Sequence, residues 1–93
     1  MPVRIEITKT DDRHYSVSVS DAAGRSSHRV TVDPAYSQKL LSRKAAPEEL
    51  IRRSFEFLLE HEPKESILSE FDLAVIQRYF PDYKKEIRRR LGG

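Results

Sequence analysis

Hydrophobic and polar residues alternate with a period of two along the first 33 residues, in three separate segments. The hydrophobic members are Val3, Ile5, Ile7, Tyr15, Val17, Val19, Val30 and Val32. Strict alternation of β-branched and polar residues is typical of antiparallel strands that bury one face. The connecting residues 10–13 and 21–24 are turn formers, with Gly24 where a positive φ is expected. Residues 1–33 are therefore predicted to form a three-stranded β-meander whose apolar face needs a cover.

After residue 33 the hydrophobic period becomes helical, and prolines mark where segments begin and end. Asp33 before Pro34 matches a helix N-cap followed by proline at the first helical position, which predicts a short helix through Leu41. Pro47 begins the main core helix, with acidic residues near its positively charged end, and Pro63 closes it. The apolar face of this helix, which we expect to cover the sheet, consists of Leu50, Ile51, Phe55, Leu58 and Leu59.

Residues 66–80 are dense in apolar side chains and allow two interpretations. Their spacing predicts a helix from about 70 to 80, with Ser69 and Asp72 as a loose match to a capping box. Alternatively, Ile67 and Leu68 pair with the sheet as a short fourth strand, because periodicity over so few residues does not separate the two.

A basic helix is predicted to end the chain. Pro81 disfavours the α conformation at Phe80 and can open a new helix. In that helix Tyr83, Ile87 and Leu91 recur every four residues, which makes a narrow apolar seam.

Together these segments predict an α+β fold with a three-stranded antiparallel sheet, to which a fourth strand is the open addition, and helices packed on one face. A length of 93 residues predicts a single domain, with the β-meander in 1–33 and the helical part in 34–93. The chain has no apolar run of about 18 residues and no signal-peptide pattern, so a cytoplasmic location is expected and a membrane span is not. The absence of cysteine excludes disulfides, thiolate catalysis and sulfur metal sites.

The strongest charge asymmetry lies at the end of the chain, although the net charge is only +2. Five cations there face a single acid, Glu86, and make up the candidate nucleic-acid contact: Lys84, Lys85, Arg88, Arg89 and Arg90. Such cations can neutralise phosphates. The alternative is that they complement the negative end of their own helix and keep the domain soluble.

The uncovered sheet face and one aromatic region are candidates for protein binding. The face is rich in serine and threonine, and flat faces with free strand edges suit association with a second copy or with another chain's strand. The aromatic region surrounds Pro81. The residues chosen from both are Ser16, Ser18, Arg29, Tyr79 and Tyr83. The alternatives are an ordinary solvated sheet face and aromatic residues that belong to the core.

No catalytic, metal or cofactor site is predicted. The three histidines, His14, His28 and His61, lack the spacing that assembles a metal site on one element, and we expect each at the surface or its rim. The terminal Gly92-Gly93 is similar to the tail of ubiquitin-like modifiers and small sulfur carriers, in which unbranched residues thread into an activating enzyme. The arginines before it favour a helix with a glycine C-cap instead.

A wider resemblance covers most of the chain. The stretches Pro47–Ile51, Ser54–Leu59 and Phe71–Tyr83 resemble an uncharacterised group of small bacterial proteins, which implies no activity and no site residues. The size and the order of strands before helices resemble small antitoxin-like partner proteins, without their DNA-binding motifs. The sequence therefore predicts a non-enzymatic module that binds another protein or itself. Nucleic-acid binding through the last helix is the alternative, and a diglycine modifier is the third possibility.

Overall fold

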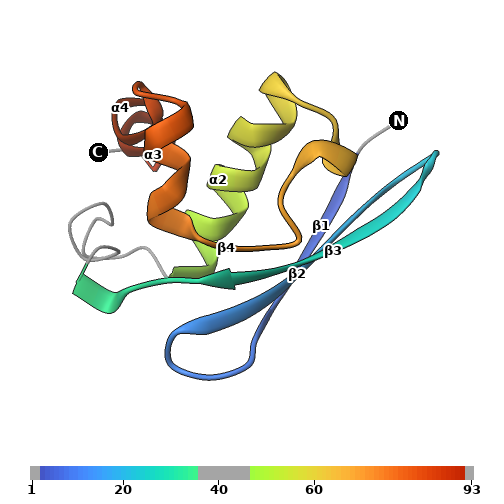
Figure 1. Cartoon of the computed structure of the whole chain (residues 1–93), viewed down its shortest axis with the longest axis horizontal. Coiled ribbons are helices and arrows are strands. Elements are labelled where there is room, and N and C mark those ends of the chain that lie inside the picture. Colours follow the sequence, from blue (N-terminus) through green and yellow to red (C-terminus); the bar gives the residue numbers. More distant parts are fainter. Residues whose placement is uncertain (1–2, 36–46, 92–93) are drawn as a thin grey trace.

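The computed structural model describes residues 3–35 and 47–91, and it has the predicted α+β class. The strands are β1 (Arg4–Lys9), β2 (His14–Asp21), β3 (Gly24–Thr31) and β4 (Glu70–Asp72). The helices are α2 (Pro47–His61), α3 (Ile76–Tyr79) and α4 (Tyr83–Arg90), with 3₁₀ turns η1 (Lys64–Ser66) and η2 (Leu73–Val75). Figure 1 shows the helices on one side of the sheet, with α2 nearest to it.

The first three strands form the predicted antiparallel meander, and aspartates shape both of its turns. The Asp11 carboxylate accepts hydrogen bonds from the backbone N–H groups of Arg13 and His14, both at 2.8 Å. In the second turn the Asp21 carboxylate accepts from the Gly24 N–H at 3.1 Å. Gly24 has a φ of 143°, which only glycine adopts without strain, so the positive φ expected there is confirmed.

The fourth strand differs from the prediction in place and direction. It consists of Glu70–Asp72 and pairs in parallel with β3, with Val30 opposite Phe71, so the sheet is mixed and the expected helix does not begin at 70. Ile67 and Leu68 lie outside any strand. The strand forms because it buries Phe71 beside Val30 on the covered face. Helical structure begins only at Leu73, after Asp72 accepts a hydrogen bond from the Ala74 N–H at 2.9 Å.

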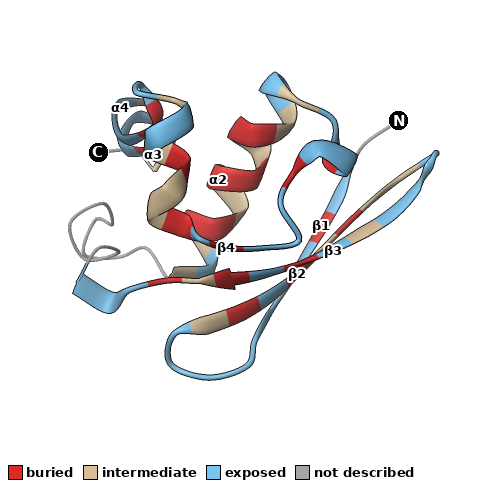
Figure 2. Cartoon of the chain, viewed as in Figure 1, coloured by how far each residue is buried: buried red, intermediate tan, exposed pale blue. Residues whose placement is uncertain are grey.

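The core lies between the covered sheet face and α2, and it draws on both parts of the chain (Figure 2). On α2, four of the five predicted core residues are buried, while Leu59 is only partly so. Phe57 is also buried, but it faces the helical layer, where its ring lies 5.7 Å from that of Tyr83. The α2 helix therefore packs on the sheet with one side and on α4 with the other.

Two predicted features fall largely beyond the described residues. Of the short helix expected after residue 33, the structure describes only Pro34 and Ala35, which are helical. The Asp33 carboxylate accepts from the Ala35 N–H at 2.9 Å, as an N-cap does. The terminal Gly92-Gly93 lies outside the described residues.

Candidate functional site

A groove with apolar walls lies between the end of α2, residues 66–71 and α3, and has a volume of about 310 Å³. Its buried walls include Leu58, Ile67 and Ile76. Leu68 and Tyr79 also line it, yet their side chains are 52% and 68% exposed. The covered walls and the two exposed side chains give this surface the form of a pocket with an apolar rim.

The exposed apolar side chains are concentrated at this groove. In the part of the chain that the structure describes, three large hydrophobic residues are exposed, and two of them are Leu68 and Tyr79. The third is Val3, just before β1. Single exposed hydrophobic residues are ordinary in soluble proteins, but their gathering at one concave surface is typical of a binding site.

A buried histidine holds one wall of the groove in place. His28 on β3 is only 4% exposed, so the prediction of a surface or rim position was wrong. Its Nδ1 lies 2.8 Å from the Leu68 carbonyl oxygen, which can only accept, so Nδ1 carries the hydrogen. In the neutral ring Nε2 then accepts from the Ser26 hydroxyl at 2.8 Å. A further hydrogen bond joins the Arg29 N–H to the Ser69 carbonyl at 2.7 Å, so two contacts fix this segment on β3.

Glu62 gives the groove its charge. It is the charged member of the groove lining, and its side chain is half-buried. Its carboxylate makes no hydrogen bond or ion pair with the described residues. A carboxylate on the wall of an apolar groove favours a cation on whatever binds there.

The five residues predicted as a protein interface do not form one surface. Ser16 and Arg29 are opposite each other on neighbouring strands, exposed on the sheet face away from the helices, and Ser18 is half-buried beside them. Tyr79 is in the helical layer at the groove. Tyr83 is fully buried, so its assignment to an interface was wrong, and its hydroxyl lies 2.6 Å from the Ser54 Oγ.

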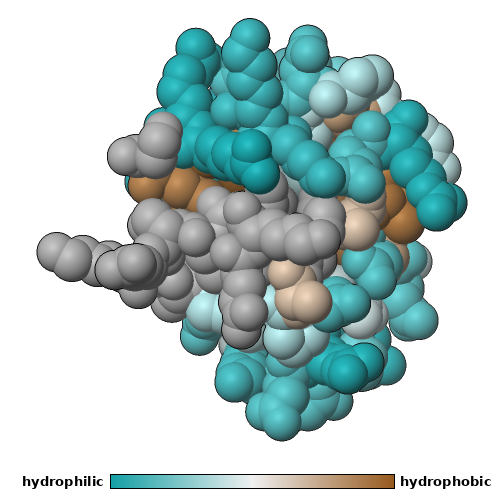
Figure 3. All heavy atoms as spheres, turned by 90° about the vertical axis from the view of Figure 1, so that its left-hand side faces the viewer, coloured by the Kyte–Doolittle hydropathy of each residue, from teal (hydrophilic) through white to brown (hydrophobic). Residues whose placement is uncertain are grey.

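The five cations at the end of the chain lie in two different environments. Four of the five predicted cations are exposed, and they line a hollow of about 450 Å³ along α4: Lys84, Lys85, Arg88 and Arg89. Seen from the end of the molecule where α3 and α4 lie, the upper surface is hydrophilic (Figure 3). Arg89 contacts Glu86 at 2.6 Å, which partly neutralises this patch.

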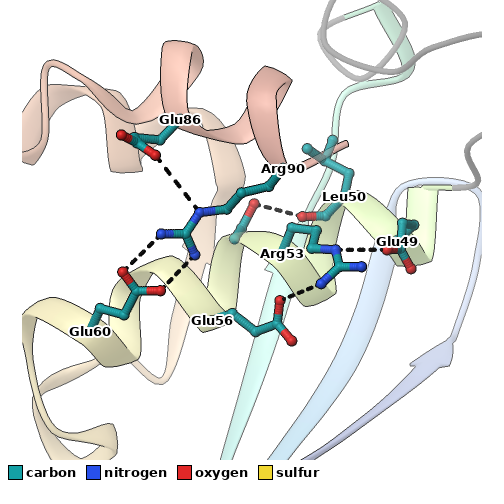
Figure 4. A network of polar contacts seen from close by, with 8 residues as sticks. Glu49, Leu50, Arg53, Glu56, Glu60, Glu86 and Arg90 are labelled. Carbon is teal, nitrogen blue, oxygen red and sulfur yellow. Dashed lines mark hydrogen bonds and ion pairs between the residues drawn. The ribbon is translucent and has the colours of Figure 1, made fainter. Parts of the chain in front are cut away.

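Arg90 belongs to the helix interface and not to the exposed patch, as Figure 4 shows. Its two terminal nitrogens each lie 2.8 Å from a carboxylate oxygen of Glu60 on α2. The guanidinium also lies 5.6 Å from the centre of the Phe57 ring. The hydrogen bond from Arg90 lowers the pKa of Glu60, and Glu60 raises the pKa of Arg90. The ion pair with Glu60 therefore separates Arg90 from the four exposed cations, and its contact with nucleic acid stays a prediction.

The remaining histidines have an acidic and an aromatic neighbour, respectively. His14 contacts the Asp11 carboxylate at 2.8 Å, and His61 packs against Phe57 with ring centres 4.6 Å apart. Within residues 3–35 and 47–91, no group of three or more histidine or acidic side chains could hold a metal ion. No helix in these ranges is both long and apolar enough to cross a membrane.

Comparisons with known protein families, with curated proteins and with solved structures found no match.

Proposed function

We propose that this chain is a protein-binding module whose groove receives a large apolar side chain that neighbours a lysine or arginine on the bound protein. The observation that carries the proposal is the gathering of Leu68 and Tyr79 around one groove with Glu62 on its wall. A non-enzymatic role and a cytoplasmic location remain parts of this proposal.

The size and construction of the groove support an anchor of this kind. A volume of about 310 Å³ is at the lower end of the range for ligand sites, which suits one or two large side chains. Protein interfaces commonly depend on an apolar anchor in such a pocket. His28 fixes the Leu68 backbone before any partner arrives, so little ordering is required when the anchor enters.

Selection from a random peptide library tests this proposal without knowledge of the natural partner. We expect the wild-type chain to enrich peptides in which a large apolar residue lies next to lysine or arginine. Tyr79→Ala and Leu68→Ala should each weaken binding of an enriched peptide by roughly tenfold, because each removes part of the apolar rim. Glu62→Lys should shift the enrichment toward acidic neighbours.

Arg78→Ala is the matched control, since Arg78 is exposed on α3 and does not line the groove. It should bind the enriched peptides as the wild type does. Enrichment without an apolar anchor, or equal binding by Tyr79→Ala and the wild type, would show that the groove is not the binding site.

A second candidate, nucleic-acid binding, keeps specific support. Lys84, Lys85, Arg88 and Arg89 line one hollow along α4, as a surface that follows a phosphate backbone requires. Arg90 forms an ion pair with Glu60, and Arg89 contacts Glu86. The positive charge of this patch is therefore smaller than the sequence predicts. We therefore prefer the groove to the α4 patch as the candidate binding site.

A further inference from the structure

The outer edge of β1 is an open strand edge. The strand order is β1-β2-β3-β4, and β1 pairs with β2 along all six of its residues. In the part of the chain that the structure describes, no strand pairs with the other side of β1. Among the described strands, none uses the outward N–H and C=O groups of β1, which a further strand could pair with.

Two charges on β1 lack partners within the sheet. Arg4 and Glu6 are exposed on the face away from the helices, where they are opposite Ser20 and Ser18 on β2. Neither side chain forms an ion pair or hydrogen bond with the described residues. Natural edge strands often carry charged side chains that keep other strands away, but here the two charges are opposite in sign and two residues apart.

We propose that a second copy of this chain pairs with β1 through its own β1, antiparallel, about a two-fold axis at Ile5. In this register Arg4 is opposite the partner's Glu6, and Glu6 is opposite the partner's Arg4. On the covered face Ile5 meets the partner's Ile5, and the exposed Val3 meets the partner's Ile7. The two four-stranded sheets thereby join into one continuous sheet. This surface is distinct from the groove.

Charge and polarity select this register over its neighbours. Because side chains alternate between faces, only shifts of two residues keep the hydrophobic side chains on the covered side. A shift in one direction places Arg4 opposite the partner's Arg4, and a shift in the other places Glu6 opposite the partner's Glu6. Like charges directly opposite each other are destabilising in a sheet, whereas opposite charges stabilise it. A two-fold interface requires such a self-complementary patch.

Charge reversal tests the register directly. Sedimentation velocity over a concentration series should show a wild-type species of twice the chain mass in equilibrium with the monomer. Arg4→Glu alone, or Glu6→Arg alone, turns two attractive pairs into two repulsive ones and should raise the dissociation constant roughly ten- to a hundredfold. The double variant Arg4→Glu with Glu6→Arg restores opposite charges and should return the dissociation constant to near the wild-type value.

Arg25→Glu serves as the control because it reverses an exposed charge on the same sheet face but on β3. It should leave the dissociation constant within about twofold of the wild-type value, and circular dichroism verifies that each variant is folded. A monomeric wild type, single reversals that leave the dimer intact, or a double variant that stays monomeric would each overturn the proposal. None of these outcomes affects peptide binding at the groove, so the two proposals fail separately.

Discussion

Tyr79 and Tyr83 are four residues apart, yet they have opposite environments. Tyr79 ends α3 and is 68% exposed at the groove, whereas Tyr83 begins α4 and is fully buried. The Ser54 hydroxyl donates its hydrogen to the Leu50 carbonyl at 2.7 Å, so the Tyr83 hydroxyl is the donor to Ser54. The apolar seam of Tyr83, Ile87 and Leu91 predicts a buried Tyr83, whereas the aromatic region around Pro81 suggested an exposed one. The helical spacing was the better guide.

The two tyrosines should therefore differ in their effect on stability. Tyr83→Phe removes the buried hydrogen bond to Ser54 and should lower the free energy of unfolding by about 1 kcal/mol. Tyr83→Ala also leaves a cavity and should cost about 3–5 kcal/mol. Tyr79→Ala should change the free energy of unfolding by no more than about 0.5 kcal/mol, because its side chain is mostly in water. Urea unfolding followed by circular dichroism measures all three; similar losses for Tyr79→Ala and Tyr83→Ala would contradict this assignment.

The burial of His28 could have been predicted from the two-residue alternation of its strand, although histidine is a polar residue. Val30 and Val32 were correctly predicted on the covered face, and His28 has the same parity in the strand. Extending the alternation backward by two residues places His28 inside. What the sequence could not show is its acceptor, the Leu68 carbonyl, which is 40 residues away along the chain.

At the level of elements, the long strands and the main helix could be predicted from the sequence, whereas the short strand β4 could not. Alternation located the three strands of the meander, and the helix expected between Pro47 and Pro63 is observed as Pro47–His61. Glu70–Asp72 is a strand only because the edge of β3 is beside it, and three residues carry no usable period. The groove depends on this strand and on the chain reversals around it, so its shape could not be predicted from the sequence.

The contact between α4 and α2 makes a prediction about pH. The hydrogen bond from Arg90 holds the pKa of Glu60 below its ordinary value of 4.5. A carboxyl group whose pKa is lower in the folded state stabilises the fold fully above its unfolded pKa, and this stabilisation is lost as the pH falls. Glu60→Gln should therefore reduce the free energy of unfolding by about 0.5–1 kcal/mol at pH 7, since the pair is partly exposed.

The difference in the free energy of unfolding between the wild type and Glu60→Gln should become smaller as the pH falls below 4.5 and through the lowered pKa of Glu60. Glu62→Gln is the matched control, because Glu62 lies just beyond the same helix and its carboxylate has no partner among the described residues. Urea unfolding at a series of pH values measures both variants. A constant difference between wild type and Glu60→Gln down to low pH would show that the ion pair does not contribute.

At the scale of the whole molecule, charge is nearly balanced but unevenly placed. The chain has 17 basic and 15 acidic residues, and many acids lie next to cations. Ion pairs engage Arg53, Lys64 and Arg90, whereas Lys85 and Arg88 project from α4 into solvent. A net charge of +2 produces no strong long-range field, so any attraction to phosphates has to come from α4 itself.

Salt dependence separates the nucleic-acid candidate from protein binding. If α4 contacts phosphates, affinity for a short DNA duplex falls with salt at a slope of about −0.9 per phosphate neutralised. Replacing Lys85, Arg88 and Arg89 together with glutamine should then reduce the magnitude of that slope by up to about 3 and weaken binding. Replacing three exposed arginines of the meander (Arg13 in its first turn, Arg25 and Arg29 on β3) with glutamine changes the net charge equally and should have a smaller effect. Equal losses in both variants, or a wild-type affinity without salt dependence, would reject α4 as a nucleic-acid site. The same α4 variant should bind groove peptides as the wild type does, because none of its three altered residues lines the groove.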